Sequence, residues 1–322
     1  MTHWKSWAIG LQNDGDVSEA YIGSITNVDT PIETNFDFSE TAGLVYSEHV
    51  TVGQQIPRVN TASFNIKQLL DSIGVLGSIF EEGSSSETGA AVYQARYNDL
   101  AIGTGSVHRR LRFRKAMATL GSLTCSHRGD ASIDMMLHGL FDGTNNPIVP
   151  ETAVALPTLP ASGGRWTLAD TTLTIGNSTF TVPVGCATEL SLDFGIDVQS
   201  FGCDSEVYDS KLDIRSIRPS VRMTIFNLDL FQEASTSHIP LAGVDADHAQ
   251  TTLRFRKRLN GQAGFVADGT AEHITMTLDG IFTIVNAHNA TTNDVATMQI
   301  EGSLTWDGTN APIIVDTAAT LS

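Results

Sequence analysis

The sequence predicts a mostly-β protein made of two tandem, similar antiparallel β-sandwich or barrel domains, each with room for one short helix. Three observations predict this class. Apolar and polar residues alternate with period two, segments rich in Gly, Asn, Ser and Pro separate the alternating stretches, and three segments of the first half recur in order in the second half. Because successive side chains of a strand point to opposite faces, the alternation indicates strands with one buried face.

Length and composition allow two globular domains. The chain has 322 residues, of which 41% are hydrophobic and 17% charged. Asp and Glu number 36 against 19 Lys and Arg, so the formal charge is −17. An acidic surface repels nucleic acid and anionic membranes, which excludes tight DNA binding by neutralisation of phosphates.

The cysteines and the N-terminus predict the compartment. The three cysteines, Cys125, Cys186 and Cys203, are an odd number without metal-ligand or redox spacing, which argues against a disulfide scaffold. No apolar run of signal-peptide or membrane length follows Met1. We therefore expect folding in a reducing cytoplasm and no membrane insertion by this chain.

Three pairs of matching segments indicate the duplication. They join residues 111–115 to 253–257, residues 142–148 to 307–313, and residues 57–69 to 219–231. Their offsets are 142, 165 and 162 residues. The shorter offset requires insertions of about 20 residues, which we expect near residues 74–102 and 283–298. The breaker-rich junction at 156–164 divides the chain into domains at 1–160 and 161–322.

Individual elements follow from the local pattern. Strands are predicted where apolar residues alternate with polar ones, at residues 188–198, 221–225 and 274–282. Residues 171–182 predict a hairpin that turns at Gly176 and Asn177. The spacing of Leu69, Ile73, Leu76 and Phe80 allows one helix in the first half.

No residue pattern indicates catalysis or a cofactor. The nine histidines are scattered, and Gly-x-Ser-x-Gly and P-loop motifs are absent from the sequence. Asp245, Asp247 and His248 offer three ligand-type side chains, but a complete calcium loop needs further acidic positions, so a polar loop is the simpler interpretation. We assign no metal and no cofactor, and we expect the protein not to be an enzyme.

Two basic strands stand out in the acidic chain. We call their arginines, which share one face of each predicted strand, the basic ridge: Arg110, Arg112 and Arg114 in the first half, and Arg254, Arg256 and Arg258 in the second. A repeated ridge favours pairing with carboxylates of neighbouring subunits. A phosphate-binding ribbon and a solvated strand face are the alternatives.

The order of features in each half resembles the major tail tube proteins of long-tailed bacteriophages. An early strand at 33–38 leads through a polar stretch at 39–55 to a strand at 57–64, a helix or loop, the basic strand and a closing strand. Residues 189–198, 199–211 and 212–226 repeat this order. The resemblance covers most of both halves through motifs of low specificity, and it departs from the usual pattern of one domain per chain.

The resemblance implies a structural virion protein that is assembled in the host cytoplasm and forms stacked rings of the tail tube. Since the family's rings are sixfold, two domains per chain imply a homotrimer with pseudo-sixfold symmetry. Its partners would be further copies of itself, other tail proteins such as a tape measure protein, and DNA in transient passage. The polar stretches at 39–55 and 199–211 would be long loops and candidates for ring-to-ring stacking.

An acidic lumen would keep like-charged DNA from adhering to the wall. The candidate lumen face is formed by Glu189, Asp193 and Asp197, and its alternative is a solvated outer face of the same strand.

Two other functions stay open. One is a capsid decoration or other tail structural protein. The other is a tandem carbohydrate-binding module, although the tryptophans do not repeat as an exposed pair; they are Trp4, Trp7, Trp166 and Trp306.

Overall fold

The computed structural model describes most of the chain. The residues it describes are 4–12, 19–24, 27–28, 32–33, 36–42, 47–54, 58–65, 70, 89–96, 107–126, 129–156, 165–169, 171–175, 178–182, 187–202, 208–226, 248–259, 264–289 and 296–321. Strands dominate these residues, and the strand pairs with a defined register are antiparallel, which confirms the predicted class. The helix expected between Leu69 and Phe80 lies outside the described residues except for Leu70.

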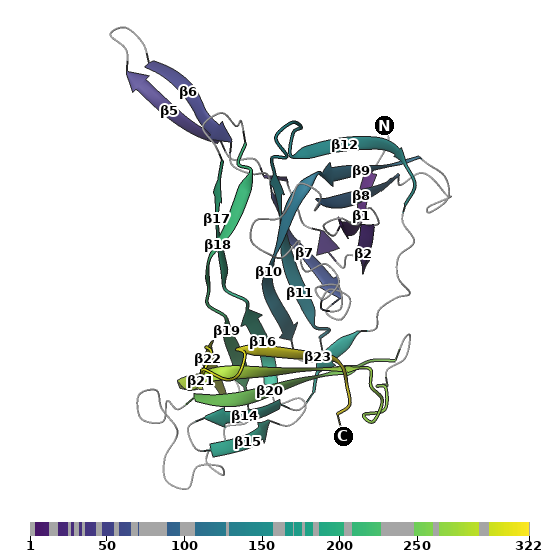
Figure 1. Ribbon diagram of the computed structural model, residues 1–322. Coiled ribbons are helices and arrows are strands. Elements are labelled where there is room, and N and C mark those ends of the chain that lie inside the picture. The colour runs from purple at the N-terminus through teal and green to yellow at the C-terminus, as the bar shows by residue number, and fades with distance from the viewer. Residues whose placement is uncertain are drawn as a thin grey trace. The chain divides into compact units, whose positions relative to one another are not determined.

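The strands are numbered along the chain as in Figure 1. Their bounds are β1 Trp4–Gln12, β2 Glu19–Ser24, β3 Asn27–Val28, β4 Ile32–Glu33, β5 Phe36–Ala42, β6 Ser47–Gln54, β7 Arg58–Asn65, β8 Gly89–Arg96, β9 His108–Phe113, β10 Lys115–Ser126, β11 Ser132–Leu140, β12 Ile148–Val154, β13 Trp166–Leu168, β14 Thr171–Ile175, β15 Ser178–Val182, β16 Ala187–Asp193, β17 Ile196–Phe201, β18 Lys211–Ile217, β19 Ser220–Ile225, β20 His248–Lys257, β21 His273–Asn289, β22 Thr297–Leu304 and β23 Ile313–Ala319.

The chain forms two compact units, and each unit takes a segment from the other half of the sequence. Unit 1 comprises residues 1–121, 134–163 and 196–216; unit 2 comprises 122–133, 164–195 and 217–322. The units therefore differ from the predicted division at residue 160 in two segments, 122–133 and 196–216. The physical reason is that β10 continues without a break, and its residues 122–126 pair with β16 of unit 2.

Unit 1 contains a five-stranded sheet in the order β12-β9-β8-β1-β2. Its buried face carries Ala91, Tyr93 and Ala95, against which Leu156 packs. A further run of strands in this unit follows the order β10-β11-β7-β3, with β4 also paired to β7. The hairpin β17–β18 packs on this run, because Leu212 shares a core with Met117 and Leu140.

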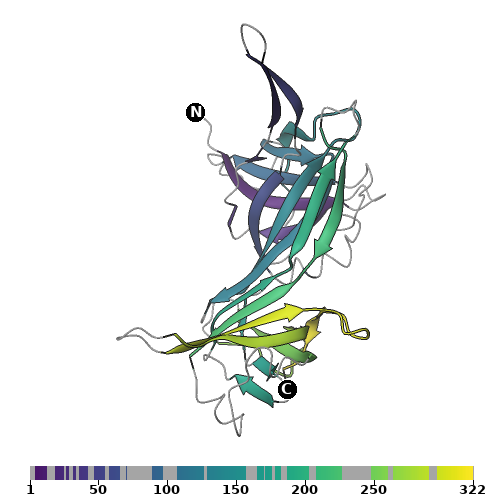
Figure 2. The same ribbon diagram turned by 90° about the vertical axis from the view of Figure 1, so that its left-hand side faces the viewer.

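Unit 2 is built on one sheet in the order β15-β14-β20-β21-β22-β19-β16. Its last strands, β21 to β23, are drawn in yellow-green to yellow in Figure 2. The strands β13 and β23 pair with β20 and β21. The predicted alternation is confirmed here: the inward residues have 6% or less of their surface exposed, namely Leu190, Leu192, Val221, Met223, Ile225, Ile274, Met276, Leu278 and Phe282. The predicted hairpin at 171–182 is confirmed by the pairing of β14 with β15, from Thr171 opposite Val182 to Ile175 opposite Ser178.

The two units repeat one strand order. In unit 2 the order β23-β21-β20-β14-β15 matches β12-β9-β8-β1-β2 of unit 1, so β9 corresponds to the start of β21 and β8 to β20. Two equivalent histidines confirm the register. The Nδ1 of His108 accepts a hydrogen bond from the Arg96 amide at 3.1 Å, and the Nδ1 of His273 accepts one from the Lys257 amide at 3.1 Å.

This correspondence corrects part of the predicted repeat. The identical segments 111–115 and 253–257 lie at the β9–β10 junction and in β20, which are not equivalent, so their match is coincidental. His108 and His273 are 165 residues apart, as are Asp142 and Asp307, and the two predicted insertions of about 20 residues are therefore wrong. The aligned segments at 57–69 and 219–231 do join equivalent strands, β7 and β19.

The polar stretches at 39–55 and 199–211 were expected to be loops, and this expectation is wrong for their described residues. Residues 39–42 and 47–54 belong to the hairpin β5–β6, whose register runs from Phe36 opposite Gln54 to Ala42 opposite Ser47. Residues 199–201 and 211 belong to β17 and β18, which form the equivalent hairpin of the second half. A two-stranded hairpin needs few apolar residues, which is why its sequence resembles a loop.

Candidate functional site

The outward face of β16, β19 and β22 forms an open hollow of about 480 Å³ in unit 2. Neighbouring strands place polar side chains side by side, with Ser191 opposite Arg222 and Arg222 opposite Glu301. Glu189 and Asp193 flank Ser191 on this face and are exposed, while Leu190 and Leu192 between them are fully buried. Two residues of the predicted lumen face therefore share one surface.

The charge of this hollow is negative. Arg222 forms an ion pair with Glu301, which leaves the carboxylates of Glu189 and Asp193 uncompensated by a cation among the lining residues. The Oδ1 of Asp193 accepts a hydrogen bond from the Gly195 amide at 2.9 Å, which holds this carboxylate at the end of β16. A surface of this charge repels phosphate groups, and its exposed position leaves it open to large molecules.

Asp197 does not belong to the same face. The sequence predicts one strand over 188–198, but Gly195 has a φ of 59° and separates β16 from β17. A Cβ at this position would lie 2.0 Å from the carbonyl oxygen of Arg218, so the close approach of two chain segments requires glycine here. Asp197 is exposed on β17, which is part of unit 1.

Four arginines of the basic ridge contact carboxylates of their own chain. Arg110 and Arg112 both lie against Glu151 of β12, and the Arg110 guanidinium also donates to the Tyr93 hydroxyl at 3.1 Å. Arg256 contacts Asp268, with 3.0 Å from Nε to Oδ1.

The Nε of Arg258 lies 3.3 Å from Asp130, which Arg165 also approaches at 3.5 Å. Asp142 lies near Arg114, whose charge contributes to the lowered pKa of that carboxyl. Arg254 lies on β20, two residues before Arg256.

The two halves of the basic ridge are not equivalent by symmetry. Arg110 and Arg112 lie on β9, whose counterpart β21 carries Thr275 and Thr277 at the same places. Arg254 and Arg256 lie on β20, the counterpart of β8. The inter-subunit role predicted from a repeated ridge therefore loses the symmetry on which it depended.

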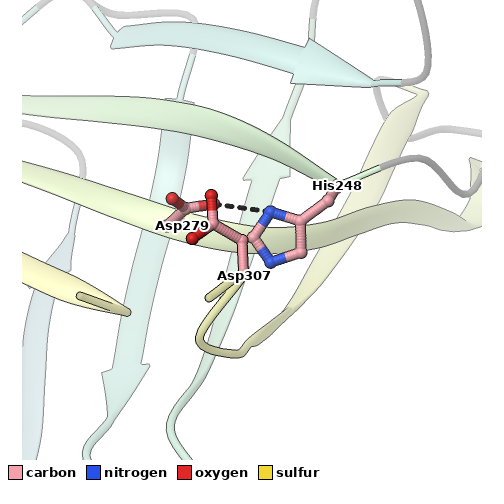
Figure 3. Close-up of side chains that lie close together, drawn as sticks. All are labelled: His248, Asp279 and Asp307. Atoms are coloured by element: carbon pink, nitrogen blue, oxygen red, sulfur yellow. Dashed lines mark ion pairs between the residues drawn. The ribbon is translucent and has the colours of Figure 1, made fainter. Parts of the chain in front are cut away.

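A second cluster joins His248, Asp279 and Asp307 at one edge of unit 2 (Figure 3). The Nδ1 of His248 lies 2.7 Å from the Oδ1 of Asp279, whose side chain is 2% exposed. The Nε2 of His248 lies 3.1 Å from the Thr305 carbonyl oxygen, and Gln250 donates to the other oxygen of Asp279 at 3.3 Å.

This cluster is best interpreted as structural. Asp307 is occupied by its own turn, because its Oδ1 accepts the amides of Thr309 and Asn310, each at 2.6 Å. The ligand-type atoms of His248 and Asp279 are likewise engaged with each other and with neighbours. His248 was noted in the sequence with Asp245 and Asp247, which lie outside the described residues. Asp279 was missed because only the pairing of β20 with β21 brings it close.

No family model matches the chain, and no curated protein matches it. Among the residues that the structure describes, none of the helical segments has the length and hydropathy to cross a membrane.

Proposed function

We propose that this chain is a structural virion protein that self-assembles into stacked rings and forms a bacteriophage tail tube through which DNA passes. The observation that carries the proposal is the strand-for-strand duplication, in which sheets, hairpins and one turn recur. The histidines and aspartates that recur with them, His108 with His273 and Asp142 with Asp307, bind backbone amides of their own unit. A repeated surface without a repeated catalytic site suits symmetric assembly, because each chain presents similar contact surfaces twice.

The acidic hollow supports the same function. Glu189 and Asp193 lie exposed on a polar sheet face, and a wall of like charge lets DNA slide without adhering. We propose this face for the lumen.

With two similar units per chain, three chains would fill a ring of six places. Other copies, a tape measure protein and passing DNA would be the partners, in a virion tail assembled in the host cytoplasm, with no enzymatic activity.

A carbohydrate-binding function is the candidate from another class. Trp306 is 69% exposed, and an exposed indole suits stacking against a sugar ring. Its equivalent in unit 1 is Phe141, which lies 6.0 Å from the Tyr208 ring and is covered by protein. This difference favours a protein partner for Trp306 over a sugar. A capsid decoration or other tail role would share the β architecture and differ in the assembly formed.

Electron microscopy of the purified protein tests the proposal. We expect hollow tubes of stacked rings, because each chain would present surfaces that complete those of the next. Tubes that do not bind added DNA fragments would agree with the acidic wall. A monomer that stays monomeric at high concentration and binds a glycan array would contradict the proposal, and closed shells or isolated capsid-like patches would favour the decoration role.

A further inference from the structure

Two segments of this chain cross from one half to the other, and both carry specific contacts. Residues 122–126 of β10 extend the sheet of unit 2 by pairing with β16, from Ser122 opposite Asp193 to Ser126 opposite Glu189. In the other direction, β17–β18 packs on unit 1. The Phe141 amide donates to the Asp209 carbonyl at 2.9 Å, and Lys115 donates to the Ser210 carbonyl at 2.6 Å.

Each crossing segment has a counterpart in the other half, and neither counterpart has a further strand partner among the described residues. The end of β10 corresponds to the end of β21, which pairs with β20 only as far as Ile281 but with β22 as far as Asn289. One edge of β21 beyond Ile281 therefore has no strand partner among the described residues. The hairpin β17–β18 corresponds to β5–β6, which forms a two-stranded sheet of its own.

The receiving surfaces also have counterparts. The strand β16, which accepts β10, corresponds to β3 and β4, and these pair with β7 on one side only among the described strands. The surface that receives β17–β18 includes Phe141 and lies next to Leu120, both half-buried. Their counterparts Trp306 and Val285 are 69% and 55% exposed. Unpaired strand edges and exposed large apolar side chains are features that native proteins cover.

We propose that a second copy of this chain covers these surfaces by repeating the internal exchange. The end of β21 of one copy pairs with β3–β4 of the next, and the hairpin β5–β6 of that next copy packs over Trp306 of the first. The contact is heterologous, because the two surfaces that meet are different, so it propagates from copy to copy in one direction. This interface rests on the proposed self-assembly and specifies the surfaces that make it.

Two variants test the interface by complementation. The first, Trp306→Glu, keeps the hairpin β5–β6 but places a charge on the surface that it covers. The second replaces residues 36–54 with a short Gly-Ser linker and keeps Trp306. Because β5–β6 pairs with no third strand among the described residues, we expect the second variant to fold, and circular dichroism with a cooperative thermal transition verifies this for both variants.

Each variant alone should remain a monomer in analytical ultracentrifugation, while the wild type forms rings. Mixed in equal amounts, they should form a heterodimer and nothing larger, because only the hairpin of the first and the Trp306 surface of the second are intact. The matched control is Phe265→Ala, which truncates another exposed aromatic residue of unit 2, 41% exposed, and should assemble as the wild type does.

The outcomes separate the interface from the proposed function. If either variant forms rings as the wild type does, or if the mixture stays monomeric while the wild type forms rings, this interface is wrong and self-assembly stands. A wild type that remains monomeric overturns both. Loss of assembly in Phe265→Ala would show a nonspecific effect of removing exposed aromatic side chains and would also overturn the interface.

Discussion

Asp142 and Asp307 organise the same turn in the two units. Each carboxylate accepts two backbone amides and the side-chain amide of an asparagine three residues later. The glycine that follows each aspartate has a positive φ, 90° at Gly143 and 99° at Gly308. At Asp142, burial opposes ionisation, but the hydrogen bonds from Asn145 and Thr144 and the charge of Arg114 outweigh it and lower the pKa. At Asp307, the amides of Asn310 and Thr309 lower the pKa.

These lowered pKa values predict a pH dependence of stability. The folded protein holds the ionised form of Asp142 more tightly than the unfolded chain does. The stabilisation is therefore present above the ordinary pKa of 3.8 and is lost as pH falls through the lower folded value. In Asp142→Ala, the free energy of unfolding should fall at pH 6 and fall much less at pH 3. Denaturant unfolding at the two pH values measures this, and an equal loss at both would contradict the account.

At this scale the sequence predicts the turns and the buried faces well. The segment Asp-Gly-Thr-Asn recurs letter for letter, and its hydrogen bonds recur with it. The equivalence of Trp4 and Trp166 could not be predicted, because it appears only when the backbone of Trp4 pairs with Arg96 and that of Trp166 with the equivalent Lys257. The identity of residues 111–115 with 253–257 gave a wrong offset for the repeat, because basic strands of similar composition match by chance.

The hairpin β17–β18 shows how an element can be missed. Its β17 alternates half-buried and exposed residues, without a run of fully buried ones. Its attachment to unit 1 depends on a few apolar contacts, in which Leu212 is 1% exposed and packs with Val198 and Ile214 around Met117 and Leu140. Period-two patterning is weak where only a few side chains are buried, and a polar composition then resembles that of a loop.

Leu212→Ala tests this attachment. Removing the buried side chain should lower the free energy of unfolding by about 2–5 kcal/mol, since the leucine fills a closed core and its loss leaves a cavity. The matched control is Ile217→Ala at the end of the same strand, where the side chain is 59% exposed and the expected change is under about 0.5 kcal/mol. Chemical unfolding curves compare the two; equal effects would mean that the hairpin is not held by this core.

At the scale of the whole molecule, the duplication is more complete than the sequence indicates. The same strand order, the same pair of hairpins and the same turn occur in both halves of the chain. The sequence predicted two domains but not the exchange of residues 122–133 and 196–216, because strand continuity and pairing leave no local signal. Of the candidate lumen face, Glu189 and Asp193 share one face of β16, whereas Asp197 lies on β17 because Gly195 separates the two strands. That this face lines a lumen stays a prediction.

The charges of β22 in unit 2 are not repeated on its counterpart β11 in unit 1. The place of Glu301 on β22 is taken on β11 by Met136, and that of Gln299 by Asp134. If the face of β16, β19 and β22 lines a tube, neighbouring places of the ring would differ in the charges that β22 and β11 carry.

The number of chains per ring tests the central claim most directly. End-on averages of assembled rings by cryo-electron microscopy, together with the ring mass from native mass spectrometry, should give three chains of 34.5 kDa arranged as six similar lobes with true threefold symmetry. A ring of six chains, or a protein that forms no ring, would contradict the claim that one chain fills two adjacent places.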